Sequence, residues 1–292
     1  MKMFDPHIHM TSRTTDDYQA MADAGIAAIV EPAFWVGQPR THVGTFEDYF
    51  LSLLGWERFR ASQFGIKHFC TLGMNPKEAN HPELSEGVLA LLPQYLEKDG
   101  VVAVGEIGFD DMTPTEEAVF QRQIQLALDA DLPILIHTPH RDKKRGTERT
   151  IAVVRESGIA PELVLIDHNN EETLQLTLDS GCWAGHSIYP HTKMDEQRMV
   201  SLVQKYGKER MIINSAADWG VSDPLKVPKT VKALQAAGIS SADIETIVWT
   251  NPASFFAQSG RLEGIDIAQP VDQRKLWEGN SVLRGQAPRV EE

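Results

Sequence analysis

Short apolar runs alternate with longer segments of helical periodicity along most of the chain. This alternation is typical of parallel βαβ units. Eight runs are predicted as strands: Met3–His9, Ala27–Glu31, His68–Leu72, Val101–Ile107, Pro133–His137, Leu163–Asp167, Cys182–Ile188 and Met211–Ser215. The helices predicted between and after them are Thr15–Ala24, Phe46–Phe64, Pro82–Leu96, Thr115–Ala130, Thr147–Ser157, Glu171–Asp179, Asp195–Tyr206 and Asp223–Ala237.

Eight strand–helix units predict an α/β protein with a single-domain TIM (β/α)8 barrel. Such a barrel occupies about 250 residues, and the chain has 292. An open doubly wound sheet also alternates strands with helices, but it usually carries a glycine-rich phosphate loop after its first strand. Here the first strand ends in His-Ile-His instead. The barrel is therefore the favoured architecture.

The barrel domain is predicted to span residues 1–261, followed by a polar C-terminal tail at 262–292. Four apolar residues in the tail suggest docking on the barrel or on a neighbouring subunit, because exposing them together is unfavourable. They are Leu276, Trp277, Val282 and Leu283. A flexible tail is the alternative, and a homo-oligomer is left open.

The amino-acid composition limits the classes of molecule that the protein is expected to bind. The net charge of −13 argues against duplex nucleic acid, since affinity for DNA comes largely from Lys and Arg at phosphates, and it favours a small or short substrate. No apolar run approaches the roughly 20 residues that cross a bilayer, and the N-terminus lacks a secretory signal. We expect a cytoplasmic protein without membrane association, with Cys70 and Cys182 as reduced core residues.

Metal-ligating residue types gather where the predicted strands end, and in a barrel the C-terminal strand ends form the active site. A lone buried histidine is most often a hydrogen-bonded core residue. A set of four on three strands, with carboxylates at two others, instead indicates a metal site. The set comprises His7, His9, Glu106, His137, His168 and Asp218.

The donor types indicate which metal would bind. Imidazole with carboxylate suits zinc, manganese or iron, and carboxylate also suits magnesium. His7 and His9 lie two apart on an extended segment, so both can face one ion. Glu106 ends an apolar strand, where a carboxylate bridging two cations would be tolerated. We expect one or two divalent ions, Zn, Mn or Mg, with Zn or Mn favoured.

Five motifs together resemble the TatD-related metal-dependent hydrolases of the amidohydrolase superfamily: FDPHIHM, GEIGFD, LPILIHTPHRD, LIDHNN and TNPASFF. The resemblance implies a distorted barrel, a binuclear site and hydrolysis of phosphodiesters, including nuclease activity. It assigns His7, His9 and Asp218 to one metal, His137 and His168 to the other, and Glu106 to both. The usual Thr/Ser-Asp-x-Pro after strand eight is replaced here by Ser-Ala-Ala-Asp-Trp-Gly at 215–220, which indicates a divergent subgroup.

The resemblance and the residues suggest a mechanism. A metal lowers the pKa of a bound water towards about 7. Asp218 is predicted to orient this water and take its proton, beside the bridging Glu106; an N-cap or loop carboxylate is the alternative for Asp218.

Substrate contacts are predicted from the loops at the strand ends. His140 and Arg141, after strand five, are expected to bind an anionic group, whereas the neighbouring lysines are expected to face water. Trp35, Tyr189 and Trp219, with His186, are expected to wall the pocket from loops after strands two, seven and eight.

The function predicted from the sequence is hydrolysis of a phosphoester or phosphodiester in a small anionic substrate. A lactonase, amidase or deaminase on the same barrel is an alternative, and a deaminase needs only one metal. A barrel that binds metal or a ligand without catalysis, within a biosynthetic pathway, is the other.

Overall fold

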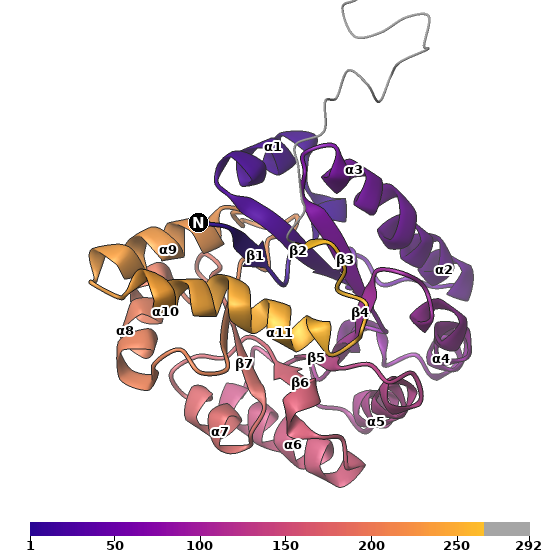
Figure 1. Cartoon of the computed structure of the whole chain (residues 1–292). Helices are drawn as coiled ribbons and strands as arrows, with labels where there is room; N and C mark the ends of the chain where they lie inside the picture. Colours follow the sequence, from indigo (N-terminus) through magenta and orange to yellow (C-terminus); the bar gives the residue numbers. More distant parts are fainter. Residues whose placement is uncertain (266–292) are drawn as a thin grey trace, which may run out of the picture.

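A computed structural model describes residues 1–265, and its centre is one parallel sheet of eight strands in sequence order (Figure 1). Each strand pairs with the next along the chain. The strands are β1 Met3–Asp5, β2 Ile26–Pro32, β3 Lys67–Leu72, β4 Val101–Gly108, β5 Ile134–His137, β6 Val164–Ile166, β7 Trp183–Ser187 and β8 Met211–Asn214. All eight predicted strands are present, and the TIM barrel prediction is confirmed.

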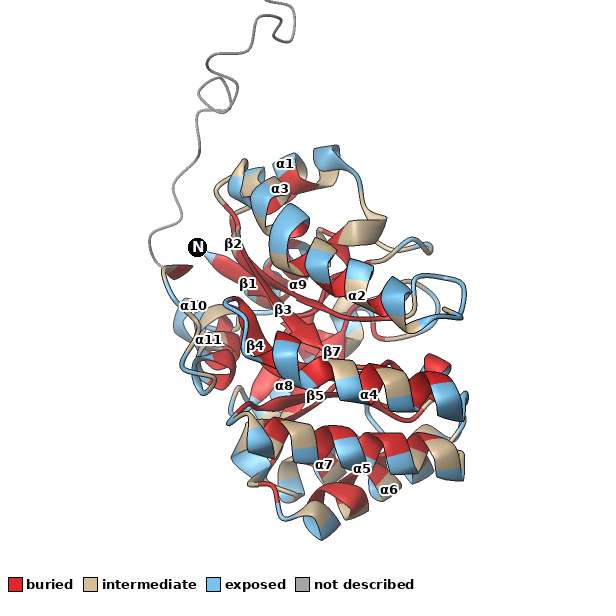
Figure 2. Cartoon of the chain, turned by 90° about the vertical axis from the view of Figure 1, so that its right-hand side faces the viewer, coloured by how far each residue is buried: buried red, intermediate tan, exposed pale blue. Residues whose placement is uncertain are grey.

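Helices lie on the outside of the sheet, with buried inner faces and exposed outer faces (Figure 2). They are α1 Thr15–Asp23, α2 Val43–Leu51, α3 Arg58–Ser62, α4 Pro82–Leu96, α5 Pro114–Asp129, α6 Lys143–Ser157, α7 Leu174–Asp179, α8 Glu196–Tyr206, α9 Lys226–Ala236, α10 Ser241–Glu245 and α11 Asn251–Ala257. Two π-helical segments, Ser52–Glu57 and Thr246–Thr250, join α2 to α3 and α10 to α11.

Backbone hydrogen bonds beyond the strand ends link the first and last strands. The Ala216 N–H donates to His7 O at 2.8 Å, and the His9 N–H donates to Ala217 O at 2.8 Å. These bonds bring the segment after β1 against the segment after β8. They thereby fix the backbone of two predicted ligands.

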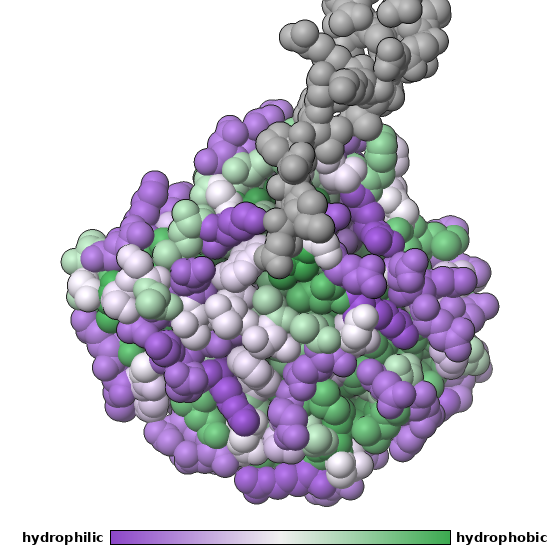
Figure 3. Space-filling model, in the orientation of Figure 1, coloured by the Kyte–Doolittle hydropathy of each residue, from purple (hydrophilic) through white to green (hydrophobic). Residues whose placement is uncertain are grey.

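The opposite end of the barrel is filled by apolar side chains and covered by α11. Phe256 packs on Phe4 of β1 with ring centroids 6.1 Å apart. The Asn251 side chain donates to Met211 O at the start of β8. Figure 3 shows this face, where hydrophilic side chains of the outer helices surround smaller hydrophobic patches. The C-terminal strand ends are therefore the end left for a site.

Three predicted boundaries were wrong in ways that affect the site. β1 ends at Asp5 rather than His9, because Pro6 has no N–H for a strand ladder and the chain bends there. The helix predicted at Phe46–Phe64 is interrupted by the π-helical segment at Ser52–Glu57. The helix predicted from Thr147 begins at Lys143, which places that lysine beside the strand ends.

The structure also bears on the predictions for the cysteines, for membrane spans and for the C-terminal tail. Cys70 and Cys182 are buried free thiols, as predicted. No helix within residues 1–265 is both long and apolar enough to span a bilayer. The predicted docking of Leu276, Trp277, Val282 and Leu283 lies outside the described residues, as does most of the tail at 262–292.

Candidate metal centre

Five of the six predicted ligands converge at the C-terminal end of the barrel. His7 and His9 lie in the bend after β1, and Glu106 is in β4. His137 is the last residue of β5, and His168 follows β6. Their exposed fractions are only 1–6%, so water reaches little of them.

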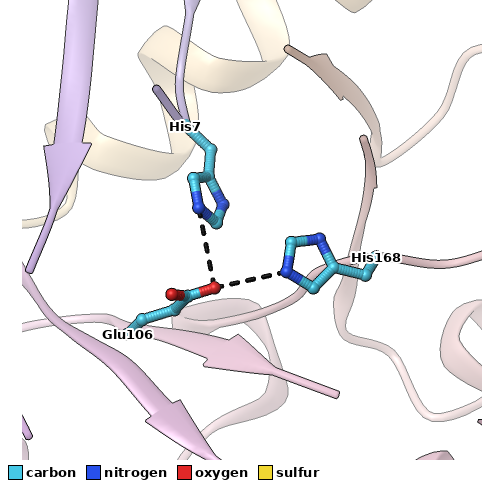
Figure 4. A group of neighbouring side chains, drawn as sticks. All are labelled: His7, Glu106 and His168. Atoms are coloured by element: carbon cyan, nitrogen blue, oxygen red, sulfur yellow. Dashed lines mark hydrogen bonds and ion pairs between the residues drawn. The ribbon is translucent and has the colours of Figure 1, made fainter. Parts of the chain in front are cut away.

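Three imidazole nitrogens surround one oxygen of Glu106. Oε1 lies 3.0 Å from His137 Nδ1, 3.2 Å from His168 Nε2 and 3.6 Å from His7 Nε2. Figure 4 shows His7 and His168 pointing toward this carboxylate from two different segments of the chain, which follow β1 and β6. Candidate ligand atoms of His7, Glu106 and His168 all lie within 4.8 Å of one another. The second oxygen, Oε2, accepts from Asn75 Nδ2 at 2.9 Å.

Hydrogen bonds on the outer side of three rings fix which nitrogen faces the centre. His7 Nδ1 donates to Asp167 Oδ2 at 2.5 Å, and His9 Nδ1 donates to Pro32 O at 3.2 Å. His168 Nδ1 bonds to Ser187 Oγ at 2.6 Å. A neutral imidazole that donates through Nδ1 leaves a lone pair on Nε2. Metal-bound histidines are commonly held in this way.

The donor set fits a divalent cation. His7 Nε2 and His9 Nε2 lie 3.1 Å apart, and with both protons on Nδ1 their lone pairs face each other. That contact is repulsive unless a cation lies between them. In the described residues, His137 Nε2 is also buried without a hydrogen-bond partner, 3.8 Å from Asp110 Oδ1. Imidazole nitrogens with carboxylate oxygens suit zinc or manganese.

Burial and neighbouring charges shift the pKa values of Glu106 and His168 in the centre. Burial raises the pKa of Glu106, but the positive charges of His7 and His137 and the histidine hydrogen bonds outweigh burial and hold it well below its usual range. Burial, followed by the charge of Lys193, lowers the pKa of His168. Ionised carboxylate and neutral imidazole are the forms that ligate metals.

Among the described residues, no hydrogen bond or ion pair joins Asp218, the sixth predicted ligand, to these five side chains. It is half-buried in the loop after β8, and its Oδ1 accepts from Tyr189 Oη and from the Gly220 N–H, both at 2.8 Å. The residues whose backbone meets His7 and His9 are Ala216 and Ala217, which carry no ligand atom. Metal ligation by Asp218 stays a prediction.

An aromatic wall stands beside His9. The Phe34 ring stacks on His9 with centroids 3.7 Å apart, and Trp219 stacks on Phe34 at 6.4 Å. Trp35 meets Trp219 edge-on at 5.2 Å. Trp219 is 47% exposed, so an apolar group in the mouth of the site could pack on it.

His186 does not contribute to this wall as predicted. It lies within β7 rather than in the following loop, its side chain is fully buried, and its Nδ1 donates to Ile212 O at 3.2 Å.

Of the two residues predicted after β5, His140 lines a pocket near the centre and Arg141 does not, whereas Lys143 lines it without having been predicted. A pocket of about 110 Å³ beside His168 is lined by His140 and Lys143, among others. Arg141 is exposed and does not line it. Lys143 turns inward, and its Nζ donates to Thr138 Oγ1 at 2.7 Å. The expectation that the lysines of this loop face water was wrong for Lys143.

Asp167 contacts the predicted ligands but was not predicted from the sequence to belong to the site. Besides His7, it accepts from Asn214 Nδ2 at 2.9 Å and from the His168 N–H at 2.6 Å. Burial raises the pKa of Asp167, but His168 and the His7 hydrogen bond outweigh it and lower the pKa below its usual range. Glu106 was predicted because it is a carboxylate at the end of an apolar strand. Asp167 in LIDHNN has the same position at the end of its strand and could have been predicted in the same way.

The fold and the site together are those of a metal-dependent hydrolase. The fold is a (β/α)8 barrel, and histidines and a carboxylate gather at the C-terminal ends of its strands. The chain belongs to the TatD related DNase family, whose model matches residues 4–257. It is 28% identical, over 257 residues, to an uncharacterized metal-dependent hydrolase of Methanocaldococcus jannaschii, covering 87% of this chain and 99% of that protein.

Solved structures agree with this assignment. The TatD-like protein of Archaeoglobus fulgidus superposes with a TM-score of 0.73 at 26% identity, covering 87% of this chain and 99% of that one. A mutant organophosphorus hydrolase from Deinococcus radiodurans gives a TM-score of 0.65 at 16% identity, with 87% and 92% covered. The second likeness concerns the fold alone.

Proposed function

We propose that the protein hydrolyses a phosphoester or phosphodiester bond in a small or short single-stranded substrate. The observation that carries the proposal is the convergence of three buried imidazole nitrogens on Glu106 Oε1. Membership of the TatD related DNase family supports a phosphodiester as the bond cleaved.

The donor set suggests two divalent ions, with zinc or manganese favoured. The histidines form two pairs: His7 Nε2 and His9 Nε2 lie 3.1 Å apart, and His137 Nδ1 and His168 Nε2 lie 3.2 Å apart. Glu106 Oε1 is within 3.6 Å of both pairs. Ions held there would act as Lewis acids, lowering the pKa of water and polarising a phosphoryl oxygen.

Asp218 is the proposed proton acceptor. Tyr189 and the Gly220 N–H hold Oδ1, whereas Oδ2 has no hydrogen-bond partner within residues 1–265. The backbone bond from His9 to Ala217 holds the loop beside the centre. Trp35 and Trp219 are proposed to pack on an apolar part of the substrate and exclude water. His140 and Arg141 remain candidates for contacts to an anionic group.

Removal of metal is expected to lower turnover of bis(p-nitrophenyl) phosphate by about a thousand-fold, because Lewis-acid stabilisation contributes several kcal/mol to the transition state. Treatment with a chelator, dialysis and re-addition of Mn²⁺ or Zn²⁺ test this, and the added ion should restore the rate. Hydrolysis of lactones or amides, with no phosphoester cleaved by the loaded protein, contradicts the substrate assignment.

Asp218→Asn separates catalysis from mere binding. A catalytic Asp218 predicts a large loss of rate with metal content retained. A barrel that only binds metal has no rate to lose. A metal content near two per chain counts against a deaminase.

A further inference from the structure

Lys193, in the segment after β7, has an ammonium group without a charged or hydrogen-bonding partner among residues 1–265. Its Nζ lies 4.9 Å from the centre of the Tyr189 ring, and no hydrogen bond or ion pair reaches it. The residue lines the pocket beside His168. Burial lowers the pKa of Lys193, opposed by the charges of Glu106, Asp167 and Asp218. The amine is thus partly buried in the pocket beside His168, with no bonded counter-ion among the described residues.

Lys143 enters the same pocket from the first turn of α6. Its Nζ donates to Thr138 Oγ1 at 2.7 Å and to Thr138 O at 3.2 Å, which are both uncharged acceptors. Burial, followed by the charge of Lys193, lowers the pKa of Lys143 to about 7. Two lysine amines therefore share one pocket with no carboxylate bonded to either, and an anion bound beside them would favour the charged form of both.

The carboxylates nearby have other partners. Glu106 faces the histidines, and Asp167 bonds to His7 and Asn214. Asp110 pairs with Lys77 at 3.1 Å. Asp218 bonds to Tyr189. A divalent ion at the centre would balance Glu106 and Asp167, which leaves both lysines uncompensated. Partly buried charges of one sign are stabilised by a counter-charge.

We propose that Lys143 and Lys193 bind a non-reacting phosphate-type group of the substrate beside the metal centre. The proposal rests on the proposed function, because it takes the histidine cluster as the place of reaction. The pocket of about 110 Å³ is far larger than the roughly 15 Å³ that one water needs. Asn170 and Thr192 also line it and offer polar side chains. Two point charges favour a dianion over a carboxylate.

Calorimetric titration of inorganic phosphate into the metal-loaded full chain tests the proposal. Lys143→Met and Lys193→Met remove a charge while keeping the length of the side chain, and each is expected to weaken phosphate binding at least about tenfold. Lys144→Met is the matched control: Lys144 is exposed in the same helix and does not line the pocket, so binding should stay within about twofold of the parent.

A charge-preserving variant and metal analysis distinguish loss of the lysine charge from misfolding or loss of metal. Lys193→Arg preserves the charge and should retain most of the phosphate binding, even if Lys193→Met folds poorly by its melting curve. Metal content, measured for every variant, should match the parent. Equal phosphate binding in the parent and both methionine variants, or tighter binding of acetate than of phosphate, overturns the proposal.

The outcome is separable from that of the proposed function. If phosphate binding depends on the two lysines but no phosphoester is hydrolysed, the proposed function is wrong and the phosphate-binding pocket is supported. If bis(p-nitrophenyl) phosphate is hydrolysed but phosphate binding does not depend on the lysines, the proposed function is supported and the phosphate-binding pocket is wrong.

Discussion

Glu106→Gln is expected to lower kcat/KM by about a thousand-fold and to deplete the protein of metal. The carboxylate is the anion on which His7, His137 and His168 converge, and glutamine replaces an ionised oxygen by a neutral amide. The remaining cluster would hold a cation among neutral imidazoles with less charge to balance it. The measurement is metal content by elemental analysis, together with the rate on bis(p-nitrophenyl) phosphate.

Glu31→Gln is the matched control for this prediction. Glu31 is equally buried and also bonded to a histidine, with Oε2 2.9 Å from His68 Nε2, but it lies outside the cluster. Its replacement should affect stability while leaving the metal content near that of the parent. Full metal content and rate in Glu106→Gln would contradict the assignment of Glu106 to the metal centre.

Asp167→Asn is expected to weaken metal binding by about 10–100-fold, the usual effect of removing an outer partner of a metal-bound histidine. An asparagine can present its NH₂ group to His7 Nδ1, which would place the proton on Nε2 and block the lone pair that faces the centre. Competition with a chromogenic chelator measures the affinity. Unchanged affinity would mean that the tautomer of His7 does not depend on Asp167.

Gly185→Ala is expected to disturb the Asp167 carboxylate by steric overlap rather than by replacing it. A Cβ at position 185 would overlap Asp167 Oδ1, so alanine should displace Asp167 from His7 and lower metal affinity in the same direction. Gly44→Ala is its control, because a Cβ there meets nothing within 4 Å. Loss of affinity in both alanine variants would indicate a general effect on the fold.

The architecture could be predicted because eight apolar runs at helical intervals leave few alternatives to a closed parallel sheet. The histidine cluster followed from the same rule, since the C-terminal ends of parallel strands meet at one end of a barrel. His7 and His9 converge even though β1 ends at Asp5, because backbone bonds to Ala216 and Ala217 hold the bend.

The remainder depends on side-chain directions outside regular structure, which periodicity does not determine. Lys143 and Arg141 belong to one basic run, but the early start of α6 turns Lys143 inward and leaves Arg141 exposed. Lys193 reaches the pocket from an irregular segment. His186 was misplaced because β7 runs through Ser187, so His186 is a fully buried strand residue rather than a loop residue.

The most direct test of the metal centre is anomalous X-ray diffraction from crystals of protein purified without added metal, with elemental analysis of the same sample. We expect one or two anomalous peaks within bonding distance of His7, Glu106 and His168, with zinc or manganese as the element found. Metal present in the sample, but bound elsewhere and absent from this cluster, would contradict the account.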